Sequence, residues 1–312
     1  MMLMSKHQWF DELQVEIKQG TLKIDEPLCK YTMTKLGGAA DLLVIPNTID
    51  EMEATVLYAH QNGIPLLVLG NGSNMVVRDG GVRGIVLHLS NLDGIKVDGT
   101  SVHAEGGANI FDVSKQASAE SLTGFEFACG IPGSVGGAMA MNAGAYGGEI
   151  KDIIVQVTVL TTEGKRIVLA KDELELGYRQ SIITKKGYYV LSADFELVKG
   201  NQKEIDVKMA DLTYQRESKQ PLEFPSAGSV FKRPPGYFAG KLIQDSGLQG
   251  KGFGGAEVSV KHAGFIVNKN NATASDYIQT IEMVRAEVKK NFGVELELEV
   301  KIVGEEVGEE LK

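Results

Sequence analysis

A short glycine-containing loop between two apolar runs, LLVLGNGSNMVV at residues 66–77, has the composition of an anion-binding loop. Successive backbone N–H groups in such a loop can turn toward one point, and Ser73 and Asn74 add two side-chain donors. A hairpin turn is the alternative, since Gly-Asn pairs are common in turns. A Rossmann fingerprint is excluded, because that motif needs a third glycine and a following helix, whereas Met75–Val77 continues as a strand.

A second segment, IPGSVGGAMAMNAGAYGG at residues 131–148, contains six glycines. Each glycine loses conformational entropy on folding, so bare backbone must serve a purpose there. One purpose is a series of turns with positive φ, and another is a bulky ligand that lies directly against the main chain. Two such segments in succession favour the second explanation, with an extended ligand held by both.

Three further residue types could interact with an anionic ligand. Arg179 carries a permanent charge and can meet a carboxylate through two hydrogen bonds, although an isolated arginine in an acidic protein more often makes a surface ion pair. Ser229 lies in an AGS sequence, where a serine commonly forms a turn. In VELELEVKIV the apolar residues alternate, so Glu295, Glu297 and Glu299 project from one face, and the alternation cannot choose among them.

Three successive α+β units must position these residues. For the first unit, which ends near Ser90, the patterns predict an amphipathic helix over 7–20, strands at 41–46, 64–70, 75–77 and 84–89, and a helix over 50–62. For the second unit they predict strands at 95–97, 101–105, 153–161, 166–170 and 190–198 and a helix over 109–121. For the third unit they predict helices over 204–216, 239–247 and 275–292 and strands at 262–268 and 294–303.

The composition is that of an ordinary globular protein of 312 residues. The net charge of −9 gives little support for a nucleic-acid partner. Cys29 and Cys129 are too few for a disulfide framework, an iron–sulfur cluster or a four-cysteine zinc site, so we expect two buried thiols and no metal. No apolar run is long enough to cross a bilayer and the N-terminus lacks a signal-peptide core, which predicts a cytoplasmic protein.

Taken together, GNGSNMVV and GIPGSVGGAMAMNAGAYGGE resemble the paired FAD-binding segments of the flavoprotein fold shared by vanillyl-alcohol oxidase and its relatives. The resemblance implies that the first loop holds the pyrophosphate of FAD and that the second segment runs beside the ribityl chain and the isoalloxazine. The space that the flavin needs would then explain why these segments contain so many glycines. The implied FAD-binding residues are Gly70, Asn71, Gly72, Ser73, Asn74, Gly130, Ile131, Pro132, Gly133, Ser134, Gly136, Gly137, Ala138, Asn142, Gly144 and Ala145.

Many oxidases of that fold attach the flavin covalently through His or Cys, often next to the first glycine loop. This loop contains neither residue. His88 and His103 lie in strand-like stretches, where a packed or surface histidine is the simpler interpretation. We therefore expect non-covalent FAD.

The C-terminal third contains PSAGSVFKRPPGYFAGKLIQDSGLQG, GGAEVSVKHAGFIVN and VELELEVKIVGE, which resemble the C-terminal domain of the bacterial UDP-N-acetylenolpyruvoylglucosamine reductase family. With LGYRQS, the resemblance extends from about Tyr31 to Glu305. The chain resembles the shorter type of this family, because LGYRQSIITKKGYYVLSADFELV passes directly to the next strand without an insertion.

The fold implied by the resemblance is α+β, with a two-part FAD-binding domain of the vanillyl-alcohol oxidase type followed by a substrate-binding domain. We place an N-terminal helical segment at 1–30, the FAD-binding subdomains at 31–92 and 93–202, the substrate-binding domain at 203–304 and an acidic tail at 305–312.

The activity implied by the resemblance is the reduction of UDP-N-acetylglucosamine enolpyruvate to UDP-N-acetylmuramate by NADPH through FAD, with ping-pong kinetics, in peptidoglycan precursor synthesis. Arg179, in the family's YR motif, would stabilise negative charge on the substrate carboxylate. Ser229 would protonate the α-carbon, and Glu299, which precedes a Val-basic-apolar strand end, would polarise the carboxylate if partly buried. Further substrate contacts are expected from Tyr178, Arg233, Lys241 and Gln244. The alternative is that each of them is an ordinary surface residue.

Two other functions remain open at this point. An oxidase of the same flavin fold that acts on a sugar or alcohol would reoxidise its reduced flavin rapidly with O₂. A flavin- or nucleotide-sugar-binding module without turnover is disfavoured by the joint presence of Arg179, Ser229 and Glu299. The sequence does not determine the oligomeric state, and a monomer is plausible.

Overall fold

The structure is a computed structural model that describes residues 5–308. It contains two compact units. Unit 1 consists of the residues up to Asp25 together with Asp41–Asn71 and Gly84–Arg216, and unit 2 consists of Glu26–Ala40, Gly72–Arg83 and the residues from Glu217 onward. The chain therefore passes from unit 1 to unit 2 inside the first glycine loop, directly after Asn71.

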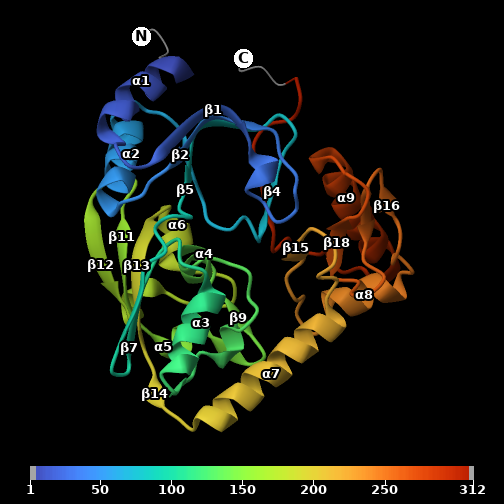
Figure 1. The fold of residues 1–312 in the computed structure, drawn as a ribbon. Coiled ribbons are helices and arrows are strands. Elements are labelled where there is room, and N and C mark those ends of the chain that lie inside the picture. The colour runs from blue at the N-terminus through green and yellow to red at the C-terminus, as the bar shows by residue number, and fades with distance from the viewer. Residues whose placement is uncertain (1–4, 309–312) are drawn as a thin grey trace. The chain divides into compact units, whose positions relative to one another are not determined.

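All six helices that the patterns predict are present among the α-helices of the structure (Figure 1). In unit 1 they are α1 (Lys6–Glu16), α2 (Ile49–Gln61), α3 (Ile110–Ala119), α4 (Val135–Ala140), α5 (Ile150–Ile153) and α6 (Ile182–Lys186). The long helix α7 (Gln202–Lys219) leads out of unit 1, and unit 2 contains α8 (Ala239–Asp245) and α9 (Ala274–Phe292).

Two sheets form the framework of unit 1. The first has the order β1-β2-β5-β3, with strands β1 (Thr21–Pro27), β2 (Ala39–Ile45), β5 (Val82–His88) and β3 (Leu66–Leu69), of which the last two are parallel. The second is antiparallel with the order β12-β11-β13-β7-β6, with strands β12 (Arg166–Ala170), β11 (Ile154–Leu160), β13 (Tyr189–Glu196), β7 (Ser101–Glu105) and β6 (Ile95–Asp98). Short pairs are made by β9 (Gly144–Ala145) with β10 (Gly148–Glu149) and by β8 (Leu122–Thr123) with β14 (Val198–Lys199).

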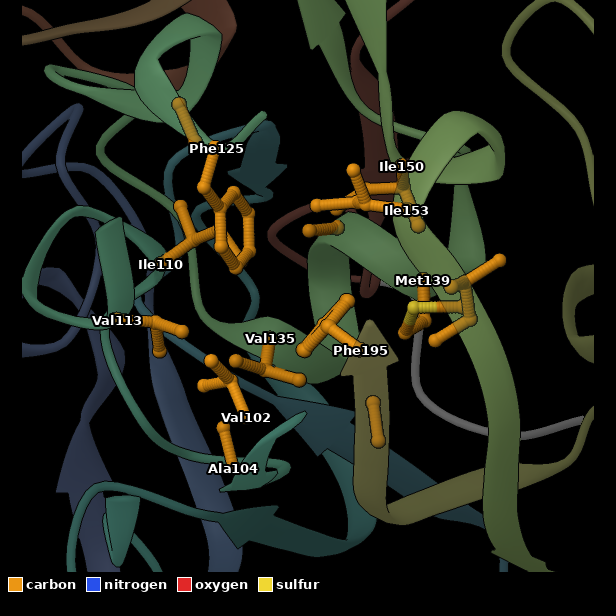
Figure 2. Close-up of a cluster of buried hydrophobic side chains, with 14 of the residues drawn as sticks. Val102, Ala104, Ile110, Val113, Phe125, Val135, Met139, Ile150, Ile153 and Phe195 are labelled. Atoms are coloured by element: carbon orange, nitrogen blue, oxygen red, sulfur yellow. The ribbon is translucent and has the colours of Figure 1, made fainter. Parts of the chain in front are cut away.

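The larger core of unit 1 lies where helices α3 and α4 pack on the five-stranded sheet (Figure 2). Phe125 and Phe195 lie at its centre, with their ring centroids 5.0 Å apart. Val135 and Met139, one turn apart on α4, are both fully buried. Burial of such side chains stabilises the fold by about 1.5–3 kcal/mol each, so this core fixes α4 and the glycine segment around it.

Unit 2 contains an antiparallel sheet and one separate parallel pair. The sheet has the order β15-β18-β17-β16, with strands β15 (Ser226–Ser229), β18 (Phe265–Asn268), β17 (Ala256–Val258) and β16 (Gly252–Phe253). The parallel pair is β4 (Met75–Val77) with β19 (Lys301–Val303). Helix α9 packs on the sheet, and its Tyr277 is fully buried and donates a hydrogen bond to Ile266 O at 2.8 Å.

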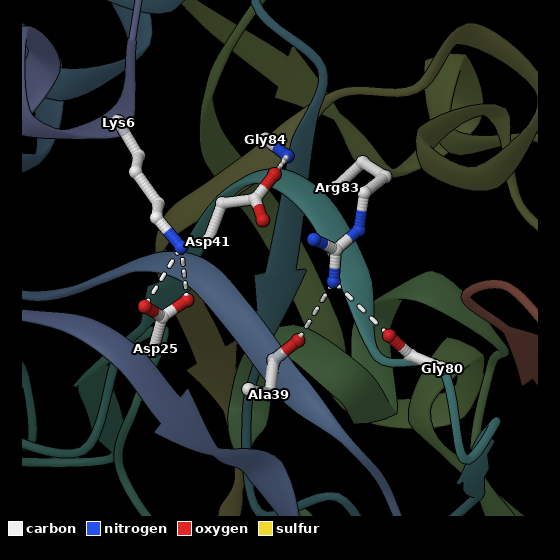
Figure 3. A network of polar contacts seen from close by, with 7 residues as sticks. All are labelled: Lys6, Asp25, Ala39, Asp41, Gly80, Arg83 and Gly84. Atoms are coloured by element: carbon white, nitrogen blue, oxygen red, sulfur yellow. Dashed lines mark hydrogen bonds and ion pairs between the residues drawn. The ribbon is translucent and has the colours of Figure 1, made fainter. Parts of the chain in front are cut away.

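Polar contacts tie loops to the sheets within each unit (Figure 3). In unit 1, the Asp41 carboxylate accepts the Gly84 N–H at 2.9 Å and Lys6 pairs with Asp25. In unit 2, one Arg83 nitrogen donates to the carbonyl oxygens of Ala39 at 3.3 Å and Gly80 at 3.1 Å. These contacts satisfy backbone groups of the loops that would otherwise need water as a partner.

The predicted strand at 294–303 is wrong for most of its length, because only Lys301–Val303 forms one. The alternation is still present in the burial, since Leu296 and Val300 are buried whereas Glu295 and Glu297 are exposed. No described strand runs beside residues 294–300, which make a single bridge from Leu298 to Phe231. Alternation therefore predicted the direction of the side chains correctly but not a regular strand.

Several elements were not predicted from the sequence. They are β1, α4, α5, α6, the strands β15, β16 and β17, and the short strands β8, β9 and β10. The helix predicted over 7–20 ends at Glu16. At the other end of the chain, the Glu305 backbone pairs with Gly80 and Gly81, and the last four residues of the predicted acidic tail lie outside the described residues. The predicted α+β class is confirmed, while the predicted domain boundaries stay predictions. Between residues 5 and 308, no helix has the length and apolar character to cross a membrane.

Candidate active site

The two glycine segments meet inside unit 1. The backbone of Gly70 lies so close to Ser134 that an added Cβ would overlap the Ser134 hydroxyl oxygen. The Asn71 side-chain amide donates to the carbonyl oxygen of Pro132 at 3.2 Å. Ser134 is buried and caps α4 by accepting the Gly137 N–H at 3.3 Å. The two glycine segments therefore lie side by side in unit 1.

The six glycines of the second segment are not equivalent. Four of them are explained by backbone conformation or by contacts with the protein itself: Gly147 at φ +88°, Gly136 beside Gly106, Gly144 beside Glu149, and Gly148 beside Phe127. Gly137 is different, because an added Cβ would lie no closer than 3.5 Å to any atom, an ordinary contact distance. A ligand is thus unnecessary to explain most of these glycines, while Gly137 and Gly147 lie beside open space.

The other predicted cofactor residues of this segment lie in or near the core of unit 1. Gly130 has φ +101°, which side chains rarely adopt. Ile131 and Ala138 pack into the core, the Gly133 carbonyl oxygen accepts the Ile110 N–H at 3.0 Å, and Ala145 lies in β9. The segment can therefore present backbone to a ligand, but its apolar side chains point into the protein.

A cavity of ≈ 460 Å³ adjoins this junction within unit 1. Its lining is mainly polar and includes Asn71, Ser90, Asn109, Asp112, Lys115 and Gln116. Amide, hydroxyl and charged groups of this kind suit a ribose and a base edge, and the volume is that of a small-molecule pocket. Apart from Asn71, these residues were missed at the sequence level, because nothing in the pattern of α3 distinguishes a cavity-lining side chain from a solvated one.

Arg179 lies at the tip of a tight turn in unit 1. The backbones of Gly177 and Gln180 exchange two hydrogen bonds of 3.1 and 3.3 Å, and Arg179 adopts φ +55°. Its guanidinium carbon lies 5.1 Å from the centroid of the Tyr178 ring, which is 53% exposed. A side chain on a short tip depends on whatever anchors the tip for its position.

Asn142 is that anchor. It is 1% exposed, has φ +44°, and donates from its amide to Gly177 O at 3.1 Å and to a Glu149 carboxylate oxygen at 2.7 Å. Its carbonyl oxygen accepts the Lys151 N–H at 2.9 Å. The side chain predicted to contact FAD therefore has three partners within unit 1, one of which is the turn that carries Arg179.

Ser229 and Glu299 come together in unit 2. Ser229 ends β15 opposite Phe265, after a bulge in which Gly228 has φ +73°. The next residue, Val230, accepts the Glu299 N–H at 2.8 Å through its carbonyl oxygen. Two residues that are 70 positions apart in the sequence are thus neighbours on adjacent backbone segments.

The surroundings also distinguish the three candidate glutamates. Glu295 pairs with Lys289 and Glu297 pairs with Lys232, and both side chains are more than 70% exposed. Glu299 is only partly exposed and has its N–H bound to the segment that carries Ser229. Of the three, Glu299 has the placement expected of the residue that acts with Ser229.

The remaining loop residues, Gly72, Ser73 and Asn74, belong to unit 2. Gly72 has φ +60°, and an added Cβ would lie 2.5 Å from Tyr31 O, so no other residue fits there. The Asn74 amide donates to the carbonyl oxygen of Glu299 at 3.0 Å. The predicted cofactor loop and the predicted catalytic glutamate are therefore in direct contact within unit 2.

The predicted substrate residues of unit 2 lie on and beside α8. The guanidinium carbon of Arg233 lies 3.9 Å from the centroid of the Phe238 ring, which is 60% exposed. Lys241 pairs with Asp245 one turn along α8, and Gln244 is exposed on the same helix. Together with Tyr178 in unit 1, these positions are accessible to a ligand.

Arg216, near the end of α7, was missed at the sequence level. An added Cβ at Gly130 would lie 2.9 Å from Arg216 Cδ. Burial lowers the pKa of Arg216 and raises the pKa of the Cys129 thiol. This places a cation beside the start of the second glycine segment, which no local pattern in TYQRES could have indicated.

The histidines considered for covalent attachment are occupied elsewhere. His88 is buried, its Nδ1 lies 3.1 Å from Leu69 O, and burial lowers the pKa of its imidazole. His103 pairs with Asp194 on the five-stranded sheet. Of the two cysteines, Cys129 is buried as predicted, whereas Cys29 is only partly buried. Within residues 5–308, no group of three or more His, Cys, Asp or Glu side chains has a metal-binding arrangement.

Comparison with known proteins matches both halves of the chain to family models. Residues 40–170, which include both glycine segments, match a model described as FAD binding domain. Residues 220–303, which include Ser229 and Glu299, match a model described as UDP-N-acetylenolpyruvoylglucosamine reductase, C-terminal domain.

Individual relatives are similar over nearly the whole chain. A UDP-N-acetylenolpyruvoylglucosamine reductase of Geobacillus kaustophilus is 61% identical over 282 residues, covering 90% of this chain and 93% of the relative. One of Listeria monocytogenes is 56% identical over 296 residues, covering 95% and 99% of the two chains. The crystal structure of the reductase of this name from Thermus caldophilus is similar with a TM-score of 0.79 at 32% identity, covering 92% and 99% of the two chains.

Proposed function

Because the chain belongs to the UDP-N-acetylenolpyruvoylglucosamine reductase family, we propose that it reduces UDP-N-acetylglucosamine enolpyruvate to UDP-N-acetylmuramate with NADPH, through bound FAD. It is a flavin-dependent oxidoreductase, a UDP-N-acetylmuramate dehydrogenase, of peptidoglycan precursor synthesis. The observation that carries this function is 61% identity over 90% of the chain. The relatives are reductases by name, so the alternative of a sugar or alcohol oxidase is not retained.

The residues present fit FAD. Two glycine-rich segments meet at Gly70 and Ser134, and a polar cavity of ≈ 460 Å³ adjoins them. We assign the pyrophosphate to the loop from Gly70 to Asn74 and the ribityl chain and isoalloxazine to residues 130–145. The cavity takes part of the adenosine end. Non-covalent FAD held there would supply hydride transfer from NADPH to the terminal carbon of the enolpyruvyl double bond.

Arg179 and Glu299 act on the substrate carboxylate. Delivery of a hydride to the terminal carbon moves the π electrons toward the α-carbon and its carboxylate, where negative charge accumulates. Arg179 binds that carboxylate through two charge-assisted hydrogen bonds. Glu299 hydrogen-bonds the same group, and both interactions strengthen as the charge develops, which lowers the barrier.

Ser229 completes the addition. Its hydroxyl donates a proton to the α-carbon, so one C–H bond forms at each carbon and the double bond is lost, while the serine oxygen regains a proton from solvent. A hydroxyl is a weak acid, but the charged α-carbon is a strong base, so placement matters more than acidity. Tyr178, Arg233, Lys241 and Gln244 bind the UDP-sugar portion through aromatic, cationic and amide groups.

An anaerobic flavin titration tests this function. The absorption spectrum of the purified protein should contain flavin bands that bleach with NADPH and return on addition of the enolpyruvyl UDP-sugar. Initial rates with both substrates should give parallel double-reciprocal lines, because NADPH leaves before the UDP-sugar binds. Rapid return of the bands with O₂ and release of peroxide would instead indicate an oxidase. Absence of flavin, with no binding of added FAD, would refute the assignment of both glycine segments.

The cellular location and assembly are secondary proposals. Both the UDP-sugar and NADPH are cytoplasmic metabolites, so we place the enzyme in the cytoplasm. A monomer is the expected state, because the proposed roles are filled by residues of one chain. Sedimentation of the FAD-loaded protein tests the second point.

A further inference from the structure

Asn74 holds the backbone on both sides of Val300, within unit 2. Its side-chain amide donates to the carbonyl oxygen of Glu299 at 3.0 Å. Its own carbonyl oxygen accepts the Lys301 N–H, also at 3.0 Å. Val300, between the two contacts, is 4% exposed and belongs to the core of the unit. The peptide groups that follow Glu299 are therefore held by a single residue of the glycine loop.

The other side of Glu299 is held by the segment that carries Ser229. Val230 O accepts the Glu299 N–H at 2.8 Å, and the Val230 N–H is itself bound to Gly264 O at 3.0 Å. Both backbone groups of Glu299 thus have partners, one beside Ser229 and one in the glycine loop. Since the side chain extends from the intervening Cα, these two hydrogen bonds set the direction in which the carboxylate leaves the backbone.

The glycine loop leads directly into the residues that contact Glu299. Gly72 packs against Tyr31, and its carbonyl oxygen accepts the Met33 N–H at 3.2 Å. After Asn74, the chain enters β4, which pairs in parallel with β19 from Met75 opposite Lys301 to Val77 opposite Val303. A displacement of the loop backbone would therefore be transmitted to residues 299–301 through two side-by-side contacts of Asn74.

We propose that Asn74 is a positioning residue that makes the geometry of Glu299 depend on occupancy of the glycine loop. This inference rests on the proposed function, in which the loop holds the FAD pyrophosphate and Glu299 acts on the substrate. A phosphate bound by the loop N–H groups orders the loop backbone, and Asn74 passes that order to the Glu299 peptide. Only bound FAD then presents Glu299 in its working position, which couples cofactor loading to catalytic competence.

Asparagine has the required groups on a short side chain. The donated hydrogen bond needs an N–H, which an aspartate at this position would lack, and alanine removes the contact entirely. Asn74→Asp therefore keeps nearly the same shape but lacks the N–H donor. Asn74→Ala removes both the donor and the rest of the amide. Asn291→Ala is a matched control, because it removes one exposed side-chain contact to Glu287 in the same unit.

Hydrogen exchange in the apo and FAD-loaded protein gives the first test. In the wild type, FAD should slow exchange in a peptide covering residues 294–303 by about 10-fold or more, because the loop and segment become ordered together. At FAD concentrations that saturate each protein, both Asn74 variants should keep the native circular dichroism spectrum yet lose most of this protection, whereas Asn291→Ala should retain it. Equal FAD-induced protection in the wild type and both Asn74 variants would overturn the proposal.

Half-reaction kinetics give the second test. With FAD saturating, Asn74→Ala should slow reoxidation by the enolpyruvyl UDP-sugar about 10-fold, a larger loss than in flavin reduction by NADPH. In a Glu299→Gln background the same substitution should have no further effect, because the two residues act as one unit. Independent, multiplying effects would overturn the proposal.

The two tests separate this inference from the function on which it rests. If the wild type gains FAD-induced protection that Asn74→Ala loses, but neither protein is reoxidised by the UDP-sugar, the positioning link stands and the substrate assignment fails. If the wild type binds no FAD, both fail.

Discussion

The two polar regions that carry the predicted catalytic groups are anchored in different ways. In unit 1, the turn with Arg179 receives from Asn142 a single side-chain hydrogen bond of 3.1 Å to Gly177 O. In unit 2, Glu299 is bound through its own N–H and carbonyl groups, by Val230 on one side and Asn74 on the other. A carboxylate held at both backbone groups is less free to move than a guanidinium at the end of a turn.

The difference follows from the side chains themselves. A guanidinium can bind a carboxylate through two N–H groups in its own plane, and its long side chain can adjust to reach the partner. Its backbone therefore needs only approximate placement. A short carboxylate that must act together with Ser229 depends on backbone position much more directly. The comparison predicts which substitutions should be severe and which mild.

The largest effect should come from Ser229 in unit 2, the proposed proton donor. Ser229→Ala removes the hydroxyl, and loss of a positioned acid costs about 10²–10⁴-fold in rate, so reoxidation by the enolpyruvyl UDP-sugar should slow by that factor. Reduction by NADPH should be unchanged. Stopped-flow absorbance of the two half-reactions measures both. Ser226→Ala, three residues earlier on the same strand, is the control and should behave as wild type. Similar loss in both variants would indicate damage to the strand and not removal of an acid.

A smaller effect should follow from loosening the turn in unit 1. Asn142→Ala leaves Gly177 O and Lys151 N–H without their partners, which costs about 1–3 kcal/mol of stability. Because the Arg179 turn loses its anchor, reoxidation should also slow by about 10-fold at saturating FAD, a change worth about 1.4 kcal/mol in the barrier. Urea denaturation and stopped-flow absorbance measure the two quantities.

Asn142→Ala also tests the comparison itself. If stability falls while reoxidation keeps its wild-type rate, Asn142 supports the fold but not the position of Arg179. If FAD affinity falls more than the reoxidation rate, the original prediction of a direct cofactor contact is favoured. If the UDP-sugar reoxidises Asn142→Ala more slowly than Asn74→Ala, the result would agree with an Arg179 turn that depends on the single hydrogen bond from Asn142.

The smallest effects concern two carboxylates that bind backbone amides, one in each unit. Partial burial acts to raise the pKa of Asp79, but hydrogen bonds from the Ser275 hydroxyl and the N–H groups of Ala274 and Ser275 outweigh it and lower the pKa below its usual value. In unit 1, the pKa of Glu51 is also lowered, because the N–H groups of Gln19, Asn47 and Gly20 outweigh the effect of burial.

The sign of the pH dependence follows from these directions. A carboxylate whose folded pKa is lowered adds stability above its unfolded pKa, near 4, and that stability is lost as the pH falls through the folded value. Asp79→Asn and Glu51→Gln should each cost about 1 kcal/mol at neutral pH and weaken the loss of stability below about pH 4. Urea denaturation from about pH 7 to about pH 2.5 measures this, across the range in which carboxylates titrate.

The single tryptophan makes the last prediction specific to a unit. Trp9 packs against the smaller core of unit 1, which also contains Met52, the neighbour of Glu51 in the sequence. Glu51→Gln should therefore shift the tryptophan fluorescence transition at least as much as Asp79→Asn does. The opposite order would show that the two units unfold as one.

Local patterns were sufficient for most helices. Thr48 and Thr273 cap α2 and α9, and Gly293 ends α9 in the left-handed conformation, so these boundaries were predicted to within one residue or so. Caps and apolar spacing act over about four residues and need no tertiary information. By contrast, α4 contains two glycines and lacks a wide apolar face, and only packing in the core makes it helical.

The sequence by itself was sufficient to identify the family and to propose the FAD-binding segments and the candidate residues Arg179, Ser229 and Glu299, because motifs at consistent spacing are preserved in the order of the chain. Only the tertiary structure decided that the Glu299 N–H binds Val230 O, next to Ser229, whereas the Glu295 and Glu297 side chains are exposed and pair with lysines. It also decided that Asn142 and Asn74 use their amides on backbone 35 and 225 residues away. Alternation specifies the direction of a side chain, whereas its hydrogen-bond partner depends on the path of distant chain, which no local pattern contains.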